Sequence, residues 1–149
     1  MLYQWDIGKD SPEHVLELFW QHQGPAAERP ANPWLLKPRA EPEPETAEEA
    51  TQRGFANELF QGAVLAATEI DSIIRRHSEN WRLERMPPVD RNILRLAVFE
   101  MLHQPETPHA VVINEALEIA RKFSEEDSVA FINGVLDQIR KESESVQPA

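Results

Sequence analysis

The segment V-D-R-N-I-L-R-L-A-V-F-E-M-L, residues Val89–Leu102, carries the clearest structural signal in the chain. Its large apolar residues follow the 3.6-residue period of an α-helix, and Pro87-Pro88 marks a break just before it. The members of this stripe are Val89, Ile93, Leu96, Ala97 and Met101. We therefore predict a helix from about Val89 that buries one face in a core.

Similar helical patterns occur on both sides of this segment. Upstream, Ser11-Pro12 reads as the N-cap and first residue of one helix, and Thr46-Ala-Glu-Glu49 is a capping box that opens another. The apolar stripe of the latter helix is predicted as Phe55, Leu59, Val64 and Leu65. A further segment carries Ile70, Ile73 and Ile74.

Downstream, Thr107-Pro108 starts a helix whose stripe ends near Phe123, and a last helix follows Ser124–Asp127. We find no convincing strand and no repeat. The predicted fold class is all-α, with six to seven helices in two small packed bundles. The predicted division is residues 1–24 as a truncated first helix and a second helix, 46–142 as the helical core, and 143–149 as a disordered tail.

Residues 25–45 form a Pro/Glu-rich insertion loop in this division. Six prolines fall in residues 25–44, a density that is incompatible with helices and sheet ladders. Trp34-Leu35-Leu36 within the loop either docks on the helical body or stays unpacked, and the pattern leaves both readings open.

Composition excludes several classes of protein. The 149 residues contain no cysteine, which rules out disulfides and thiolate metal sites. No apolar run approaches the roughly 20 residues of a membrane span, and no signal peptide is visible, so we expect no membrane contact and a cytoplasmic location. There is no phosphate-binding Gly loop, no H-E-x-x-H motif and no nucleophile elbow, so we expect no enzyme activity and no bound metal.

The net charge of −11 argues by itself against nucleic acid, because proteins bind phosphates through Lys and Arg. The charge is unevenly placed, however. Residues 1–50 hold 4 basic and 10 acidic residues, net −6, and five of these acids lie in Glu41–Glu49. Basic patches elsewhere in the chain remain compatible with the composition.

Three polar residues interrupt apolar helical patterns: Arg95, Asn114 and Asn133. They either lie at the edges of the stripes and reach solvent, or form a buried polar network that sets how three helices dock. Gly134 follows Asn133 in the middle of the last helix, where glycine costs about 1 kcal/mol relative to alanine. We interpret Gly134 as a point of close approach to another helix.

Three blocks of the sequence together resemble the NusB family of transcription antitermination factors. They are Val89–Leu102, V-I-N-E-A-L-E-I-A-R-K-F (Val112–Phe123) and E-D-S-V-A-F-I-N-G-V-L-D (Glu126–Asp137). The opening M-L-Y-Q-W-D and H-S-E-N-W at His77–Trp81 fit as well. The resemblance covers Gly54–Lys141 and the first two helices, and leaves the insertion loop outside.

The resemblance implies a function as well as a fold. It implies binding of boxA RNA together with the small-subunit ribosomal protein NusE, within a complex of other Nus factors and RNA polymerase that supports ribosomal RNA transcription. No cofactor is implied. The alternative is a NusB-like helical module that acts through protein contacts only, or an RNA-targeting module like those of ribosomal RNA cytosine methyltransferases.

Residue by residue, the resemblance implies that Tyr3, Asp127 and Phe131 lie near the RNA, where the two rings could stack on bases. Core packing is an equal alternative for Phe131. Arg121 and Lys122 could meet phosphates, or could be a solvated helix end.

Two further positions follow from the resemblance. His77 stands where some members carry a Tyr, which makes it a weaker stacking candidate. Asp90 matches a position near the NusE partner, and could equally cap the helix that starts at Val89. The family typically has a longer, Arg-rich first helix ahead of Leu2-Tyr3. We expect upstream codons to encode it, the alternative being a form without the basic arm.

Overall fold

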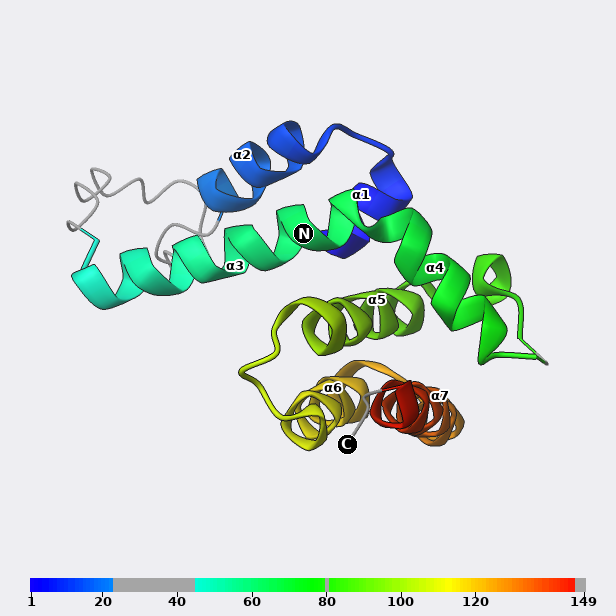
Figure 1. Cartoon of the computed structure of the whole chain (residues 1–149). Helices are drawn as coiled ribbons and strands as arrows, with labels where there is room; N and C mark the ends of the chain where they lie inside the picture. Colours follow the sequence, from blue (N-terminus) through cyan, green and yellow to red (C-terminus); the bar gives the residue numbers. More distant parts are fainter. Residues whose placement is uncertain (23–44, 80, 147–149) are drawn as a thin grey trace.

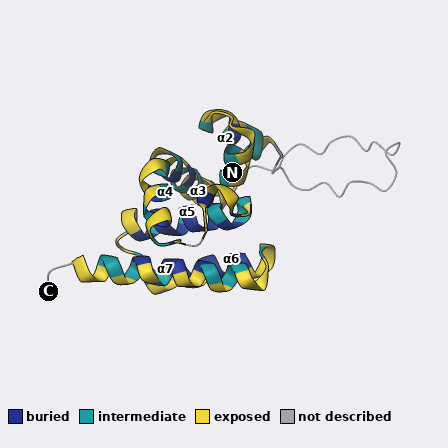
Figure 2. Ribbon diagram, turned by 90° about the vertical axis from the view of Figure 1, so that its right-hand side faces the viewer, coloured by how far each residue is buried: buried dark blue, intermediate teal, exposed yellow. Residues whose placement is uncertain are grey.

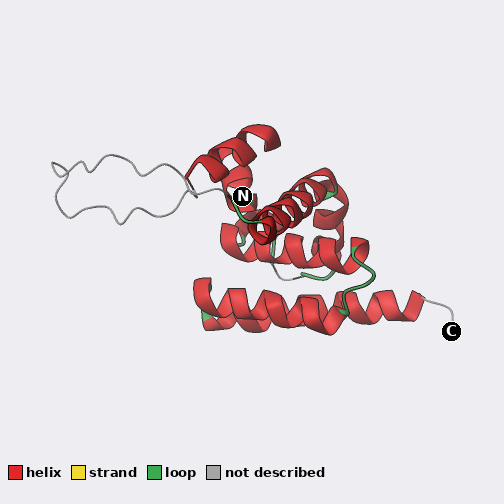
Figure 3. Cartoon of the chain, turned by 90° about the vertical axis from the view of Figure 1, so that its left-hand side faces the viewer, coloured by secondary structure: helices red, strands yellow, loops and turns green. Residues whose placement is uncertain are grey.

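The computed structural model describes residues 1–22, 45–79 and 81–146. This part of the chain contains seven α-helices and one short 3-10 helix, and no strand (Figure 3). The bounds are α1 Leu2–Gly8, α2 Pro12–His22, α3 Ala47–Leu65, α4 Ala67–Arg76, η1 Leu83–Arg85, α5 Pro88–His103, α6 His109–Phe123 and α7 Glu126–Val146. The all-α prediction is confirmed.

The structure bears on the predicted division at its C-terminal end. The insertion loop, with Trp34-Leu35-Leu36, lies outside the described residues apart from Glu45. The tail expected from residue 143 is wrong for residues 143–146, because α7 continues to Val146. An ion pair of 3.2 Å between Arg140 and Glu144, one turn apart, supports this polar last stretch.

Two of the helix starts follow directly from their capping residues. The Thr46 side chain accepts a hydrogen bond from the Glu49 backbone N–H at 3.2 Å, and the Glu49 carboxylate accepts from the Thr46 N–H at 2.8 Å. The capping box is therefore complete. At α2, Ser11 Oγ accepts from the His14 N–H at 3.3 Å, as an N-cap does.

Helix α5 lies at the centre of the molecule. Helices α1 and α3 pack on one side of it, with α2 lying against α1 and α3, and helices α6 and α7 pack on the other side (Figure 1). The inner sides of α6 and α7 are buried and their outer sides are exposed (Figure 2). Of the predicted stripe, Ile93, Ala97 and Met101 are buried, while Val89 and Leu96 are half-buried.

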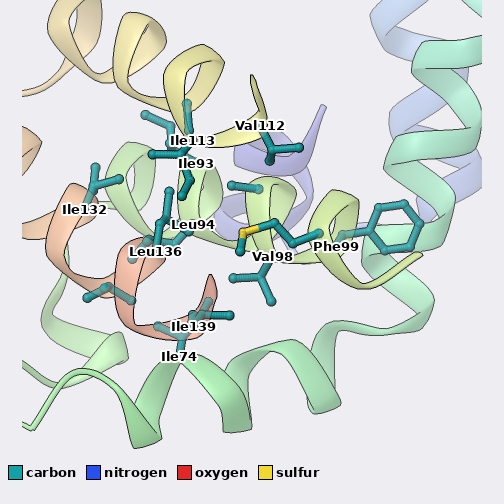
Figure 4. Packing of buried hydrophobic residues seen from close by; sticks show 14 of the residues in the cluster. Ile74, Ile93, Leu94, Val98, Phe99, Val112, Ile113, Ile132, Leu136 and Ile139 are labelled. Carbon is teal, nitrogen blue, oxygen red and sulfur yellow. The ribbon is translucent and has the colours of Figure 1, made fainter. Parts of the chain in front are cut away.

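A central helix buries more than one stripe. In α5, Leu94 and Val98 are fully buried in addition to the predicted face, because neighbours cover α5 on several sides. They meet residues of three other helices in one cluster (Figure 4). The labelled members from these three helices are Ile74 of α4, Val112 and Ile113 of α6, and Ile132, Leu136 and Ile139 of α7.

The predicted core face of α3 is wrong for Phe55 and Leu65, while Leu59 and Val64 are half-buried. Phe55 is 53% exposed and Leu65 is 88% exposed, whereas Phe60 and Ala63 are buried. The reason is the small residue Gly62, which lets α3 approach α5 closely. A Cβ atom at Gly62 would lie 2.3 Å from Cζ of Phe99, and Figure 4 shows Phe99 pointing away from the α6 and α7 side.

Candidate nucleic-acid interface

The first turns of α7 carry two of the residues expected near RNA. Asp127 is exposed in the first turn, where the helix dipole favours an acid. Phe131 follows one turn later on the same flank of the helix and is half-buried, packed against the edge of the core. Its ring also faces that of Trp81, with centroids 5.4 Å apart and the ring planes tilted by 41°.

Trp81 reaches Phe131 because the connection between α4 and α5 runs alongside α7. Three contacts occur in order from the end of α4 to the first turn of α5: His77 with Glu142 near the end of α7, Trp81 with Phe131, and Asp90 with Ser124 just before α7 begins. Trp81 is 52% exposed. Sequence reasoning did not select it as a functional residue, although a tryptophan among arginines was a usable signal.

Arg121 and Lys122 are exposed in the last turn of α6. Arg121 lines a shallow depression between α6 and α7, with Ser124, Ala130 and Asn133 on its other walls. Residues on a helix are rotated by about 100° from one to the next, so this depression and Phe131 lie on different flanks of α7. A single strand of RNA that crosses the start of α7 could reach both Phe131 and this depression.

Tyr3 lies apart from this group. It is 50% exposed on α1, and α1 packs on the side of α5 that faces away from α6 and α7 (Figure 1). His77 is also separate from Phe131. Its side chain is only 16% exposed and its Nε2 lies 2.5 Å from Glu142, so the imidazole is engaged in tying α4 to α7.

Asp90 does not present its carboxylate on the surface. It is 4% exposed and accepts a hydrogen bond from the Ser124 hydroxyl at 2.5 Å. It makes no capping bond to the start of α5 among the described residues. The position near NusE that the resemblance implies for Asp90 stays a prediction. Asp90 joins the first turn of α5 to the link between α6 and α7.

The predicted network of three buried polar residues is wrong for two of them. Asn114 and Asn133 are exposed on the outer sides of α6 and α7. The close approach assigned to Gly134 is wrong as well, because nothing lies within 4 Å of a Cβ atom built there. Each of these residues sits at the solvent edge of an apolar stripe, so no neighbouring helix covers it.

Gly134→Ala is therefore expected to stabilise the protein. Alanine gains helix propensity of about 0.8–1 kcal/mol over glycine, and the added methyl group meets no atom. A urea titration should show an increase in the free energy of unfolding close to this size. A decrease would indicate that something covers this face of α7 in solution.

Arg95 is the one of the three polar residues that is buried, at 7% exposure. Its guanidinium donates to both carboxylate oxygens of Asp71, at 2.8 and 3.0 Å, and lies 3.1 Å from Asp6. Asn92 completes the group by accepting from Arg95 at 3.1 Å and donating to Asp6 at 2.9 Å. We call Asp6, Asp71, Arg91, Asn92 and Arg95 the polar cluster.

Charge pairing dominates the ionisation of the polar cluster. Burial alone would raise the pKa of Asp6, but hydrogen bonds from Arg91 and Asn92 and the nearby positive charge of Arg95 hold it below its usual range. Burial would likewise lower the pKa of Arg95, but Asp71 and Asp6 raise it. Both groups are therefore charged at neutral pH.

The polar cluster holds α1 in place. No residue of α1 is buried, so little apolar area attaches this helix to α5. Its attachment comes largely from Asp6, from partial packing of Leu2 on the core, and from Trp5, whose ring centroid lies 5.7 Å from the Arg95 guanidinium.

Acid should therefore loosen α1. Because the pKa of Asp6 is lower in the folded than in the unfolded chain, its stabilising effect is present above about pH 4 and is lost as the pH falls through the folded-state value. Wild-type protein should lose more unfolding free energy between pH 5 and 2.5 than Asp6→Asn. Equal losses in urea titrations of the two proteins would contradict this role of Asp6.

No other grouping in the described residues suggests chemistry. They contain no group of three or more His, Asp or Glu that could hold a metal ion. None of the described helices is long and apolar enough to cross a membrane. The arrangement is that of an all-α binding protein with aromatic and basic side chains exposed around the start of α7.

Comparison with known proteins identifies the family. The NusB family model matches residues 1–141, and the chain belongs to this family. The transcription antitermination protein NusB of Koribacter versatilis (strain Ellin345) is 47% identical over 142 residues, which cover 95% of this chain and 82% of the relative. That of Desulforapulum autotrophicum is 40% identical over 139 residues, or 93% of this chain and 82% of the relative.

Solved structures agree with this assignment. A structure of T. maritima NusB matches with a TM-score of 0.71 and 31% identity, covering 95% of this chain and 83% of that one. A crystal structure of the antitermination factors NusB and NusE in complex with dsRNA matches with a TM-score of 0.71 and 26% identity. The match covers 95% of this chain and 88% of the chain in that structure.

Proposed function

We propose that this chain is a cytoplasmic transcription antitermination factor that binds boxA RNA together with the ribosomal protein NusE. In this role it joins other Nus factors and RNA polymerase and supports transcription of ribosomal RNA. The observation that carries the proposal is the match, over 95% of the chain, to a NusB structure that contains NusE and RNA.

The exposed side chains around α7 support an RNA-binding role. Phe131 offers ring surface at the start of α7, and Arg121 and Lys122 offer positive charge at the adjacent end of α6. Asp127 can accept hydrogen bonds from base edges or ribose hydroxyls. Tyr3 lies across α5 from this group, so in this proposal it contacts a separate stretch of the RNA.

NusE has a specific part in the proposal. With a net charge of −11, the chain alone is expected to bind RNA weakly, because few counterions are released on binding. A second protein that contacts the same RNA raises the apparent affinity of both by linkage. Joint binding with NusE therefore explains how a chain with a net negative charge can bind RNA.

The test is a fluorescence anisotropy titration of labelled boxA RNA, with and without NusE. Tight binding is expected only when both proteins are present, and scrambled RNA of the same composition should bind much more weakly. NusE binding without any effect of RNA sequence would favour the alternative of a module that acts through protein contacts alone.

A further inference from the structure

We propose that Trp81, packed on Phe131, is a stacking platform for one unpaired base of single-stranded RNA, and that Arg82 and Arg85 bind the adjoining phosphates. This inference rests on the proposed function, since it specifies how part of the RNA is held. It adds the connection between α4 and α5 to the RNA-binding surface.

The exposure of Trp81 is the first observation. Tryptophan is one of the most buried residue types on average, yet 52% of Trp81 is open to solvent. The indole contacts the Phe131 ring at a centroid distance of 5.4 Å, which supports it from the side of α7. The open part of the ring offers a flat apolar surface of the kind on which bases stack.

Described residues before and after Trp81 anchor it to the rest of the protein. The Trp81 N–H donates to the Ser78 carbonyl at 3.1 Å, and the buried Ser78 hydroxyl donates to the Ile74 carbonyl at 2.7 Å. After Trp81, Leu83 and Met86 are buried in the core. A ring that is already fixed in place loses little conformational entropy when a ligand binds it.

The local charge has the sign that RNA requires. Residues 75–85 contain four arginines and two glutamates, net +2, in a chain whose net charge is −11. Arg75 is paired with Glu84 at 2.6 Å. Arg82 and Arg85 are exposed, and neither is within ion-pair distance of any residue that the structure describes. Both charges are therefore available to phosphates, with that of Arg82 partly offset by the nearby carboxylate of Glu84.

The apolar area around Trp81 bears on the kind of ligand. Protein interfaces are themselves enriched in tryptophan and arginine, but their centres are rich in contiguous apolar area. Trp81 instead stands among exposed charged side chains, including Arg82, Glu84 and Arg85. A single ring with cations beside it matches the way single-stranded nucleic acid is bound, by stacking combined with phosphate contacts.

The experiment is an anisotropy titration of boxA RNA at several salt concentrations, with the full chain and NusE present. Trp81→Leu should weaken binding about 5- to 150-fold, as the loss of one stacked base does, with an unchanged salt dependence because stacking releases no counterion. Trp81→Phe should keep most of the affinity. Arg82→Gln should reduce the slope of log K against log salt by about 0.7.

Phe55→Leu is the matched control, since Phe55 is 53% exposed on α3 and should have no effect on RNA affinity. Trp81→Gln serves as a second non-aromatic variant should Trp81→Leu fail to fold. If the folded non-aromatic variants, Trp81→Leu or Trp81→Gln, bind RNA like Phe55→Leu, the platform is overturned while the proposed function stands. Absence of RNA binding by wild-type protein with NusE would instead overturn the proposed function.

One further outcome concerns the kind of ligand. NusE binding is measured without RNA for wild-type protein and Trp81→Leu, and equal affinities are expected. Weaker NusE binding by Trp81→Leu in the absence of RNA would make Trp81 a protein contact and overturn the inference.

Discussion

Arg95→Met is expected to lower the free energy of unfolding by about 3 kcal/mol. Methionine keeps much of the volume of the arginine side chain but leaves Asp71 largely buried without its cation, and removing one partner of a buried ion pair costs about 3–5 kcal/mol. We place the effect at the lower end because the side chains of Asp6 and Asp71 retain 12% and 16% exposure. Urea titration at neutral pH measures this loss.

Two further variants test whether Arg95→Met loses stability because its ion pair is buried. Arg140 also contacts two carboxylates, those of Asp137 and Glu144, but its side chain is 32% exposed. Arg140→Met should change stability far less than Arg95→Met, because solvent screens exposed ion pairs. Adding Asp71→Asn to Arg95→Met should restore part of the loss. Similar losses for Arg95→Met and Arg140→Met would contradict the importance of the polar cluster.

Gly62→Ala is expected to destabilise the protein by about 1–3 kcal/mol, although alanine favours helices. The new methyl carbon would lie 2.3 Å from Cζ and 2.8 Å from Cε2 of Phe99. The Phe99 ring has little room to move, because it is 8% exposed and stacks on His103 with centroids 4.9 Å apart. Either the ring or the whole of α3 must shift.

Gly54→Ala is the matched control in the same helix. Nothing lies within 4 Å of a Cβ atom at Gly54, so this change should stabilise the protein by about 0.5–1 kcal/mol. Thermal melts should therefore move in opposite directions for the two alanine variants. A gain in stability for Gly62→Ala would mean that Phe99 adjusts freely, and that α3 is not held close to α5 by this contact.

Local sequence signals predicted local structure well. The Thr46–Glu49 capping box and the Ser11 cap depend on residues three apart, and both are present in the structure. In α6 the helical period runs through the buried residues Val112, Ile113, Ala116, Leu117 and Ala120, although Phe123, the predicted end of this stripe, is 70% exposed. Such features are visible in sequence because the interacting groups are neighbours along the chain.

Features that depend on distant contacts were less accessible. The sequence contains Gly62 and Gly134 in similar helical settings, and only the position of Phe99 shows that Gly62 is the one in close contact. Asp90 reads as a surface acid until Ser124 is found beside it. The polar cluster joins Asp6 to Arg91, which lie 85 residues apart.

The candidate interface likewise has one residue that could be selected from the sequence and one that only the structure reveals. Phe131 was selected because its surroundings in the last helix resemble the family, and the structure places it at the start of α7. Trp81 was missed because its contact with Phe131 joins two segments that are far apart in the sequence. One is the connection between α4 and α5, and the other is helix α7. Family resemblance identified one half of this aromatic pair, and three-dimensional packing supplied the other.

The central claim is that this chain acts in antitermination through boxA RNA and NusE, and a transcription assay tests it most directly. Purified RNA polymerase, NusE and the other Nus factors would transcribe a template with boxA upstream of a terminator, with and without the chain. We expect the chain to increase read-through on this template, and to have no effect when boxA is scrambled or NusE is omitted. Unchanged read-through, or an equal increase on the scrambled template, would contradict the claim.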